Sequence, residues 1–158
     1  MQQNRREFLN KMGIAGLISA LAGTGFFTPE MAMAAADPRN IPAFDAKTLD
    51  EALKALGANG APTSADVQLT APDIAENGAV VPINVSSTIA KTDAIAILVE
   101  KNPNPLAAIM YIPDGTDPVV TARVKMQQTS NIIILARADG KYYSLSKEVK
   151  VTLGGCGG

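Results

Sequence analysis

Residues 132–145 read Ile132-Ile133-Ile134-Leu135-Ala136-Arg137-Ala138-Asp139-Gly140-Lys141-Tyr142-Tyr143-Ser144-Leu145. An Asp-Gly pair between two runs rich in β-branched, aromatic and other apolar residues is typical of a two-residue β-hairpin, because both positions of the favoured turn need a positive φ. We therefore predict strands over residues 132–137 and 141–145, joined by a tight turn at Asp139-Gly140.

The segments around this hairpin are also patterned as strands. Further strands are predicted over residues 67–70, 81–86, 94–99, 106–112, 120–127 and 148–153. Most of them alternate apolar and polar residues, as strands with one buried face do, whereas the unbroken apolar run 94–99 suits a strand covered on both faces. Because proline cannot donate to a ladder, Pro82 predicts an edge position or a bulge for its strand.

One helix is predicted before these strands. Thr48 and Glu51 have the spacing of a capping box, an apolar stripe follows, and Gly57 ends the pattern. Residues 37–42 hold two prolines and are expected to be extended. One helix and many short strands predict a mainly β fold, an immunoglobulin-like antiparallel β-sandwich domain over residues 37–153 with one short N-terminal helix and a flexible C-terminal arm.

Residues 1–36 have the features of a twin-arginine signal peptide. Arg5-Arg6 precede an uncharged run from Met12 to Pro29, and small residues follow as far as Ala36. A transmembrane anchor is the alternative interpretation, but the glycines in this uncharged run make it only weakly hydrophobic. We expect cleavage after Ala34 or Ala36, a periplasmic location and no membrane attachment after cleavage. Since this route carries folded proteins, we also expect a partner that lacks a signal of its own.

The composition excludes several classes of function. A formal net charge of −1 gives no support for nucleic-acid binding. With no histidine and one cysteine, the chain cannot build a Ser-His-Asp or Cys-His arrangement or an ordinary zinc, copper or haem site, so we expect no cofactor, no metal and no catalysis of its own. Met110 and Met126 are expected in the core. Four carboxylates fall in predicted turns, where such residues usually serve turn geometry: Asp73, Glu76, Asp114 and Asp117.

The pentapeptide Gly154-Gly155-Cys156-Gly157-Gly158 contains the only cysteine of the sequence. Glycines supply no side chains to bury a thiol, so we expect this carrier arm to be flexible and to present Cys156 to other proteins. From Leu153 to Cys156 the extended chain spans about 10 Å, enough to enter a cleft. We interpret Cys156 as a covalent handle that partner enzymes load and unload.

Several segments resemble the SoxY family, the sulfur-carrying subunit of the bacterial thiosulfate-oxidising Sox system. They are PDIAENGAVVP at 72–82, EKNPNPLAA at 100–108, and VKVTL at 149–153 followed by GGCGG at 154–158. The resemblance implies covalent substrate attachment at Cys156, with Gly154, Gly155, Gly157 and Gly158 forming the carrier arm. It also implies a heterodimer with SoxZ, loading of thiosulfate by the haem protein SoxAX, hydrolysis to sulfate by SoxB, and oxidation of the remaining sulfane sulfur by SoxCD where that enzyme is present.

Two other interpretations remain open from the residues. The chain could be an exported β-sandwich adaptor that dimerises through a Cys156 to Cys156 disulfide. Alternatively, Gly157-Gly158 could form a thiocarboxylate, as the tails of ubiquitin-like sulfur carriers do. For a stable partner, we predict an exposed apolar patch near residues 81–85 or 120–126.

Overall fold

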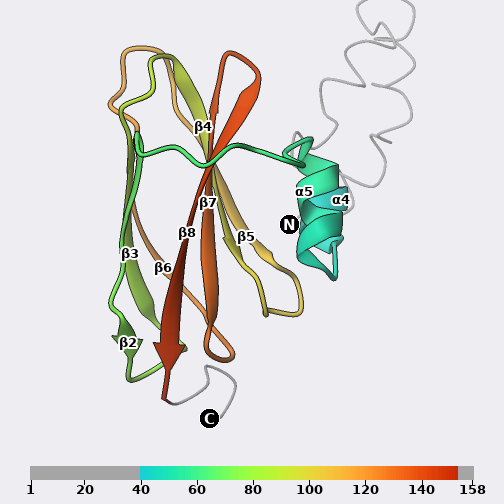
Figure 1. The fold of residues 1–158 in the computed structure, drawn as a ribbon, viewed down its shortest axis with the longest axis vertical. Coiled ribbons are helices and arrows are strands. Elements are labelled where there is room, and N and C mark those ends of the chain that lie inside the picture. The colour runs from blue at the N-terminus through green and yellow to red at the C-terminus, as the bar shows by residue number, and fades with distance from the viewer. Residues whose placement is uncertain (1–39, 153–158) are drawn as a thin grey trace, which may run out of the picture. The chain divides into compact units, whose positions relative to one another are not determined.

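The computed structural model describes residues 40–152, which form two β-sheets packed face to face, with two short helices (Figure 1). The helices are α4 (Ile41–Asp45) and α5 (Leu49–Leu56), and the strands are β1 (Val67–Thr70), β2 (Ile74–Ala75), β3 (Val81–Ser87), β4 (Thr92–Val99), β5 (Leu106–Tyr111), β6 (Val119–Val124), β7 (Ser130–Ala138) and β8 (Lys141–Val151). Within the described part of the chain, neither helix has the length and apolar character needed to cross a membrane.

The sheets have the order β1-β3-β6 and β2-β8-β7-β4-β5. Neighbouring strands are antiparallel, except that the two-residue strand β2 runs parallel to β8. The predicted immunoglobulin-like β-sandwich is therefore confirmed, with a five-stranded sheet that is wider than its three-stranded partner.

The predicted hairpin is confirmed at its turn. Ala138 pairs with Lys141, and the two residues between them, Asp139 and Gly140, have φ angles of 48° and 73°. Strand β8 then continues without interruption to Val151, where we had predicted one strand over 141–145 and another over 148–153. No glycine or proline lies between the two segments, so nothing in this part of the chain forces a turn.

Strands β4 and β7 are buried on both faces, as the apolar run 94–99 predicts. On one face, Ile95 and Ile134 belong to the core between the two sheets. On the other, Leu98 and Leu135 pack against the helices. Burial of each such side chain stabilises the fold by about 1.5–3 kcal/mol, so these two strands form the centre of the domain.

The predicted helix is confirmed as α5, with a capping box between Thr48 and Glu51 and with Gly57 at φ 73° as its C-cap. The prediction of an extended segment over 37–42 is wrong for its last two residues, since Ile41 and Pro42 begin α4. Pro42 is tolerated because main-chain N–H groups in a first turn have no partner within the helix. Thus two described helices, and not one, precede the strands.

The edge position predicted for the strand with Pro82 is wrong. This strand, β3, lies at the centre of the three-stranded sheet. Its neighbour β1 pairs only with residues 84–87, so Pro82 has a partner strand on the β6 side alone. The missing N–H therefore leaves no gap in the β1–β3 ladder.

The prediction of an apolar patch near residues 81–85 or 120–126 is wrong. The large apolar side chains of these strands point into the core, and exposed positions on the same strands include Asn84, Thr121 and Arg123. Thr121 donates its hydroxyl to Asn84 Oδ1 over 2.6 Å, which makes this face polar. Beside these two segments, large apolar side chains are exposed at Val80, the residue before β3, and at Val119, the first residue of β6.

Candidate functional site

The residues predicted to carry the function, Cys156 with Gly154, Gly155, Gly157 and Gly158, lie outside the described residues. The structure does describe the point from which this segment departs. We call the last described part of β8 and the residue after it, Lys150, Val151 and Thr152, the arm root. Its hydrogen bonds determine how rigidly the end of the sheet is held at the point where the carrier arm begins.

Strand β2 and the residue on either side of it hold one edge of the arm root. The main-chain N–H of Lys150 donates to the carbonyl oxygen of Asp73 over 3.0 Å, and that of Thr152 donates to Ala75 over 3.1 Å. The Thr152 hydroxyl also donates to the carbonyl oxygen of Glu76 over 3.1 Å. These three bonds extend the parallel pairing of β2 with β8 one residue past the end of β8.

The other edge of the arm root is held by a side chain. The main-chain N–H of Val151 donates to the hydroxyl oxygen of Thr129 over 2.9 Å. Because Thr129 directly precedes β7, this bond prolongs the β7–β8 ladder, whose last paired residues are Ser130 and Val149. Each main-chain N–H from Lys150 to Thr152 therefore has a partner, so the sheet remains ordered to the end of the described chain.

An ion pair between β8 and the residue before β2 helps to hold β2 in place. Lys147 Nζ lies 2.9 Å from Asp73 Oδ1 and donates to the carbonyl oxygen of Ala71 over 2.6 Å. The hydrogen bond from Lys147, together with its positive charge, lowers the pKa of the Asp73 carboxyl from its ordinary value. Asp73 thus has a structural role, but through an ion pair with β8 and not through the turn geometry that was predicted for it.

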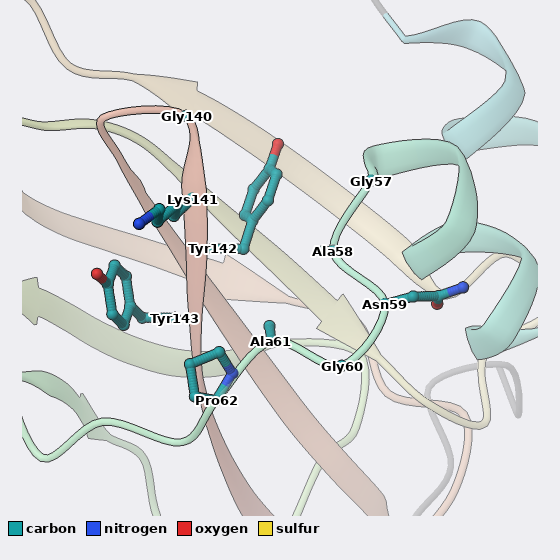
Figure 2. Close-up of a pocket in the computed structure, with 10 residues that line it drawn as sticks. All are labelled: Gly57, Ala58, Asn59, Gly60, Ala61, Pro62, Gly140, Lys141, Tyr142 and Tyr143. Atoms are coloured by element: carbon teal, nitrogen blue, oxygen red, sulfur yellow. The ribbon is translucent and has the colours of Figure 1, made fainter.

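Two pockets lie at the opposite end of the sandwich. One, of about 320 Å³, lies between the loop that follows α5 and the β7–β8 hairpin, and Figure 2 shows Tyr142 beside this loop. The other, of about 250 Å³, lies between the β3–β4 and β5–β6 connections. Strand β8 runs the length of the sheet from the first pocket to the arm root, about 33 Å at roughly 3.3 Å per residue.

This distance bears on what the cysteine can reach. Cys156 is the fourth residue after Thr152, a span of at most about 14 Å, so Cys156 cannot reach either pocket of its own chain. A pocket of this kind could therefore receive the thiol only if it belonged to another molecule.

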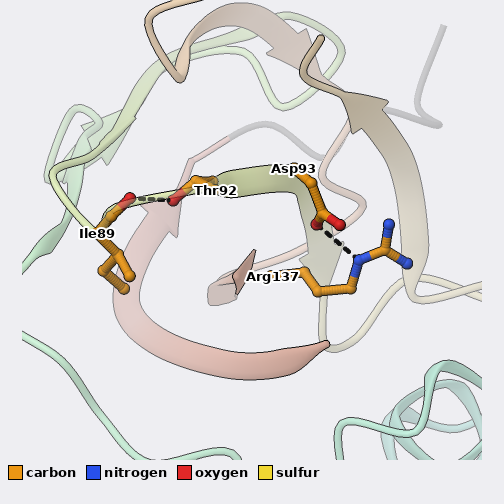
Figure 3. A network of polar contacts seen from close by, with 4 residues as sticks. All are labelled: Ile89, Thr92, Asp93 and Arg137. Atoms are coloured by element: carbon orange, nitrogen blue, oxygen red, sulfur yellow. Dashed lines mark hydrogen bonds and ion pairs between the residues drawn. The ribbon is translucent and has the colours of Figure 1, made fainter. Parts of the chain in front are cut away.

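A polar network at the same far end joins β4 to β7 and closes the β3–β4 connection (Figure 3). Arg137 Nε donates to Asp93 Oδ1 over 2.7 Å, and the Thr92 hydroxyl donates to the carbonyl oxygen of Ile89 over 2.8 Å. The Asp93 carboxylate raises the pKa of Arg137, whose guanidinium also lies 5.9 Å from the centre of the Tyr111 ring. This network stabilises the strands and is remote from the arm root.

The methionine prediction holds for one residue of two. Met126 is fully buried in the core, whereas Met110 is exposed, so its prediction as a core residue is wrong. Met110 pairs with Ile95 across the β4–β5 ladder, but β5 is the outermost strand of the wider sheet. No group of three or more histidine, cysteine, aspartate or glutamate side chains suited to a metal ion occurs among residues 40–152.

Comparison with known proteins gives a consistent result. The family model described as "Sulfur oxidation protein SoxY" matches residues 53–156. The solved structure of the sulfur carrier protein SoxY from Chlorobium limicola f thiosulfatophilum is similar to this chain, with a TM-score of 0.61 and 37% sequence identity, over 69% of this chain and 96% of the other. No curated protein sequence matches the chain significantly.

Proposed function

This chain belongs to the SoxY family of sulfur oxidation proteins, and from that premise we propose that it is a non-catalytic carrier that holds sulfur intermediates covalently on Cys156. The observation that carries the proposal is the extent of the family match, which runs through the body and the arm root to the only cysteine of the chain. The similar solved protein is itself described as a sulfur carrier.

The geometry of the body supports a division of labour. The arm root is held on one edge by main-chain hydrogen bonds to the β2 segment and on the other by the bond from the Val151 N–H to the Thr129 hydroxyl, and the two pockets lie beyond the reach of Cys156. A carrier needs a stable base and an accessible thiol, while the groups that activate the sulfur belong to the enzyme that receives it. The absence of histidine from the sequence supports the same division.

The proposed loading step forms a bond between Cys156 Sγ and the outer sulfur of thiosulfate. The thiol loses its proton, and two electrons leave with formation of the S–S bond and pass to SoxAX. The product is a cysteine S-thiosulfonate, in which Cys156 Sγ is bonded to a sulfur that carries the sulfonate group.

The proposed unloading steps take place on partner enzymes. SoxB adds water across the bond between the outer sulfur and the sulfonate, which releases sulfate and leaves a persulfide on Cys156 without any change in electron count. SoxCD, where present, then takes six electrons from the outer persulfide sulfur, to which water supplies three oxygen atoms, and a second hydrolysis by SoxB releases the resulting sulfonate as sulfate. The glycines on both sides of Cys156 give these enzymes access to the sulfur.

We further propose a stable heterodimer with SoxZ, which family membership supports. Since the outer face around residues 81–85 and 120–126 is polar, that face is a poor candidate for the interface. Strand β5 is better suited, because among the described strands it pairs with β4 alone and because Met110 and Tyr111 are exposed on it. An unpaired strand edge with exposed apolar side chains is a common site of association.

A periplasmic location, reached through the twin-arginine pathway, is the corresponding proposal for residues 1–36. The motif Arg5-Arg6 and the small residues before Asp37 support it. These residues lie outside the described part of the chain. Replacement of both arginines by lysine should retain the precursor in the cytoplasm, which cell fractionation would detect.

Substitution of the cysteine tests the carrier proposal. Cys156→Ser should abolish thiosulfate oxidation in a system reconstituted from the heterodimer, SoxAX and SoxB, while Ser146→Ala, an exposed change on β8, should leave the rate unchanged. Full activity of Cys156→Ser would favour a thiocarboxylate on Gly158. Formation of a disulfide dimer does not distinguish a carrier from an adaptor, because an exposed thiol oxidises in both cases.

A further inference from the structure

Two apolar side chains beside the arm root, Ile74 and Val80, are exposed to solvent. We propose that they form a docking contact for the enzymes that act on Cys156, and we call them the root patch. The inference rests on the carrier function proposed above and identifies the surface of the carrier body that those enzymes touch.

The root patch lies next to the end of β8. Ile74 pairs with Lys150 in the β2–β8 ladder, and 58% of its surface is exposed. Val80 directly precedes the buried Val81 at the start of β3 and is 53% exposed. Both residues belong to the segment between Asp73 and Val81, and Figure 1 shows that β2 and the end of β8 lie at the same end of the sandwich.

The backbone that carries the root patch is held in place. The N–H of Met126 donates to the carbonyl oxygen of Gly78 over 2.7 Å, and the N–H of Ala79 donates to Asn77 Oδ1 over 2.8 Å. The bonds from Lys150 and Thr152 described above fix the other half of the segment. A surface that is already ordered loses little conformational entropy when a partner binds to it.

The length of the carrier arm indicates which part of the body an enzyme must face. A cleft that receives Cys156 has its rim within about 14 Å of Thr152, since Cys156 is the fourth residue after Thr152. Such an enzyme covers the end of the sandwich where Ile74 and Val80 are exposed. By contrast, Tyr111 and Val119 pair with Ala94 and Ser86, at the other end of their strands.

The size of the root patch fits a transient partner. Two half-exposed side chains contribute a small apolar contact, whereas obligate interfaces are large and apolar. A carrier that visits several enzymes in turn must be released after each visit, so a weak contact is appropriate. The partner surface is therefore the mouth of an enzyme cleft that presents apolar side chains around the entry path of the arm.

Steady-state hydrolysis tests this proposal. The substrate is the full heterodimer with SoxZ, loaded with thiosulfate on Cys156, and the enzyme is SoxB. The double variant Ile74→Ser and Val80→Ser should raise KM about tenfold and leave kcat unchanged, because only binding of the body is weakened. Val119→Ser, which alters an equally exposed valine at the far end, is the matched control and should keep the KM of the unsubstituted protein.

Three results would overturn the root patch. They are an unchanged KM in the double variant, an equal increase in the Val119→Ser control, and loss of SoxZ binding by the double variant in size-exclusion chromatography, which would assign the patch to the stable partner. If the unsubstituted loaded heterodimer releases no sulfate at all, the proposed carrier function fails as well. Failure of the docking contact alone is thus distinguishable from failure of the carrier function.

Discussion

The main-chain N–H of Thr152 donates to the carbonyl oxygen of Ala75 over 3.1 Å, although the two residues are far apart in the sequence. This bond continues the parallel pairing of β2 with β8 beyond Val151. The sheet therefore remains ordered until two residues before Gly154, the first residue of the carrier arm. A short second strand thus fixes the position from which the arm departs.

Loss of the Thr129 hydroxyl should loosen the arm root. Thr129→Val removes the acceptor of the Val151 N–H, and an unpaired main-chain donor that is shielded from water costs about 1–3 kcal/mol. We expect faster hydrogen exchange at Val151, by about fivefold or more. Thr129→Ser, which keeps the hydroxyl, should show the exchange rate of the unsubstituted protein, and equal rates in all three proteins would contradict the role given to this bond.

Acid should weaken the support of β2. The pKa of Asp73 is lower in the folded protein than its ordinary value because Lys147 donates to the carboxylate. The ion pair therefore stabilises β2 fully above the unfolded pKa of about 4, and this contribution is lost as the pH falls through the lower, folded value. The protection factor of the Lys150 amide, which is corrected for the intrinsic pH dependence of exchange, should fall as this contribution is lost, and Asp73→Asn should remove the fall. A protection factor that falls in the same way in Asp73→Asn would contradict the assignment.

Truncation of a central core side chain should destabilise the whole domain. Ile134 is fully buried between the sheets, so Ile134→Ala leaves a cavity and should lower the free energy of unfolding by about 2–5 kcal/mol. Val119→Ala, at an exposed position, should change it by less than about 0.5 kcal/mol. Urea denaturation followed by circular dichroism measures both, and similar values for the two variants would contradict the core assignment.

A large side chain next to the cysteine should slow the reactions on the partner enzymes without changing the intrinsic reactivity of the thiol. Gly155→Leu and Gly157→Leu should each slow hydrolysis of the loaded carrier by SoxB about tenfold to a hundredfold, because a displaced sulfur is poorly aligned for attack. The rate of alkylation of Cys156 by iodoacetamide should stay within about twofold, since a small reagent needs no narrow cleft. Equal effects on both rates would show that the substitutions act on the thiol itself.

Local patterns in the sequence predicted much of the fold. The Asp139-Gly140 turn, the Thr48–Glu51 capping box and the two-sided burial of residues 94–99 each depend on neighbours in the chain, and each is confirmed. Such features need no knowledge of which strand lies beside which. They determine the fold class because short strands and one buried run leave few alternatives.

The errors share a different cause. The central position of β3, the exposure of Met110 and the polar outer face near Thr121 all depend on the order of the strands and on the unequal widths of the two sheets. Periodicity shows which side chains share a face, but it does not show what covers that face. Helix α4 was missed because it is only five residues long and because its cap, Asn40, also bonds the distant Ala55 carbonyl.

For the candidate site too, the sequence predicted the feature that is local and missed the one that depends on strand order. Cys156 stands out from composition alone, since it is the only cysteine and has glycine on both sides. The support of the arm root could not be predicted, because β2 has two residues and pairs with a strand that is distant in the sequence. A parallel pairing of this length has no periodicity to detect.

Mass spectrometry of the C-terminal tryptic peptide tests the carrier function most directly. Cleavage after Lys150 yields residues 151–158, which contain Cys156 alone as a thiol. After incubation of the heterodimer with thiosulfate and oxidised SoxAX, this peptide should gain the mass of S₂O₃, and later treatment with SoxB should remove SO₃ and leave a persulfide. A peptide that stays unmodified, or that appears only as a Cys156 disulfide dimer while thiosulfate is consumed, would contradict the account.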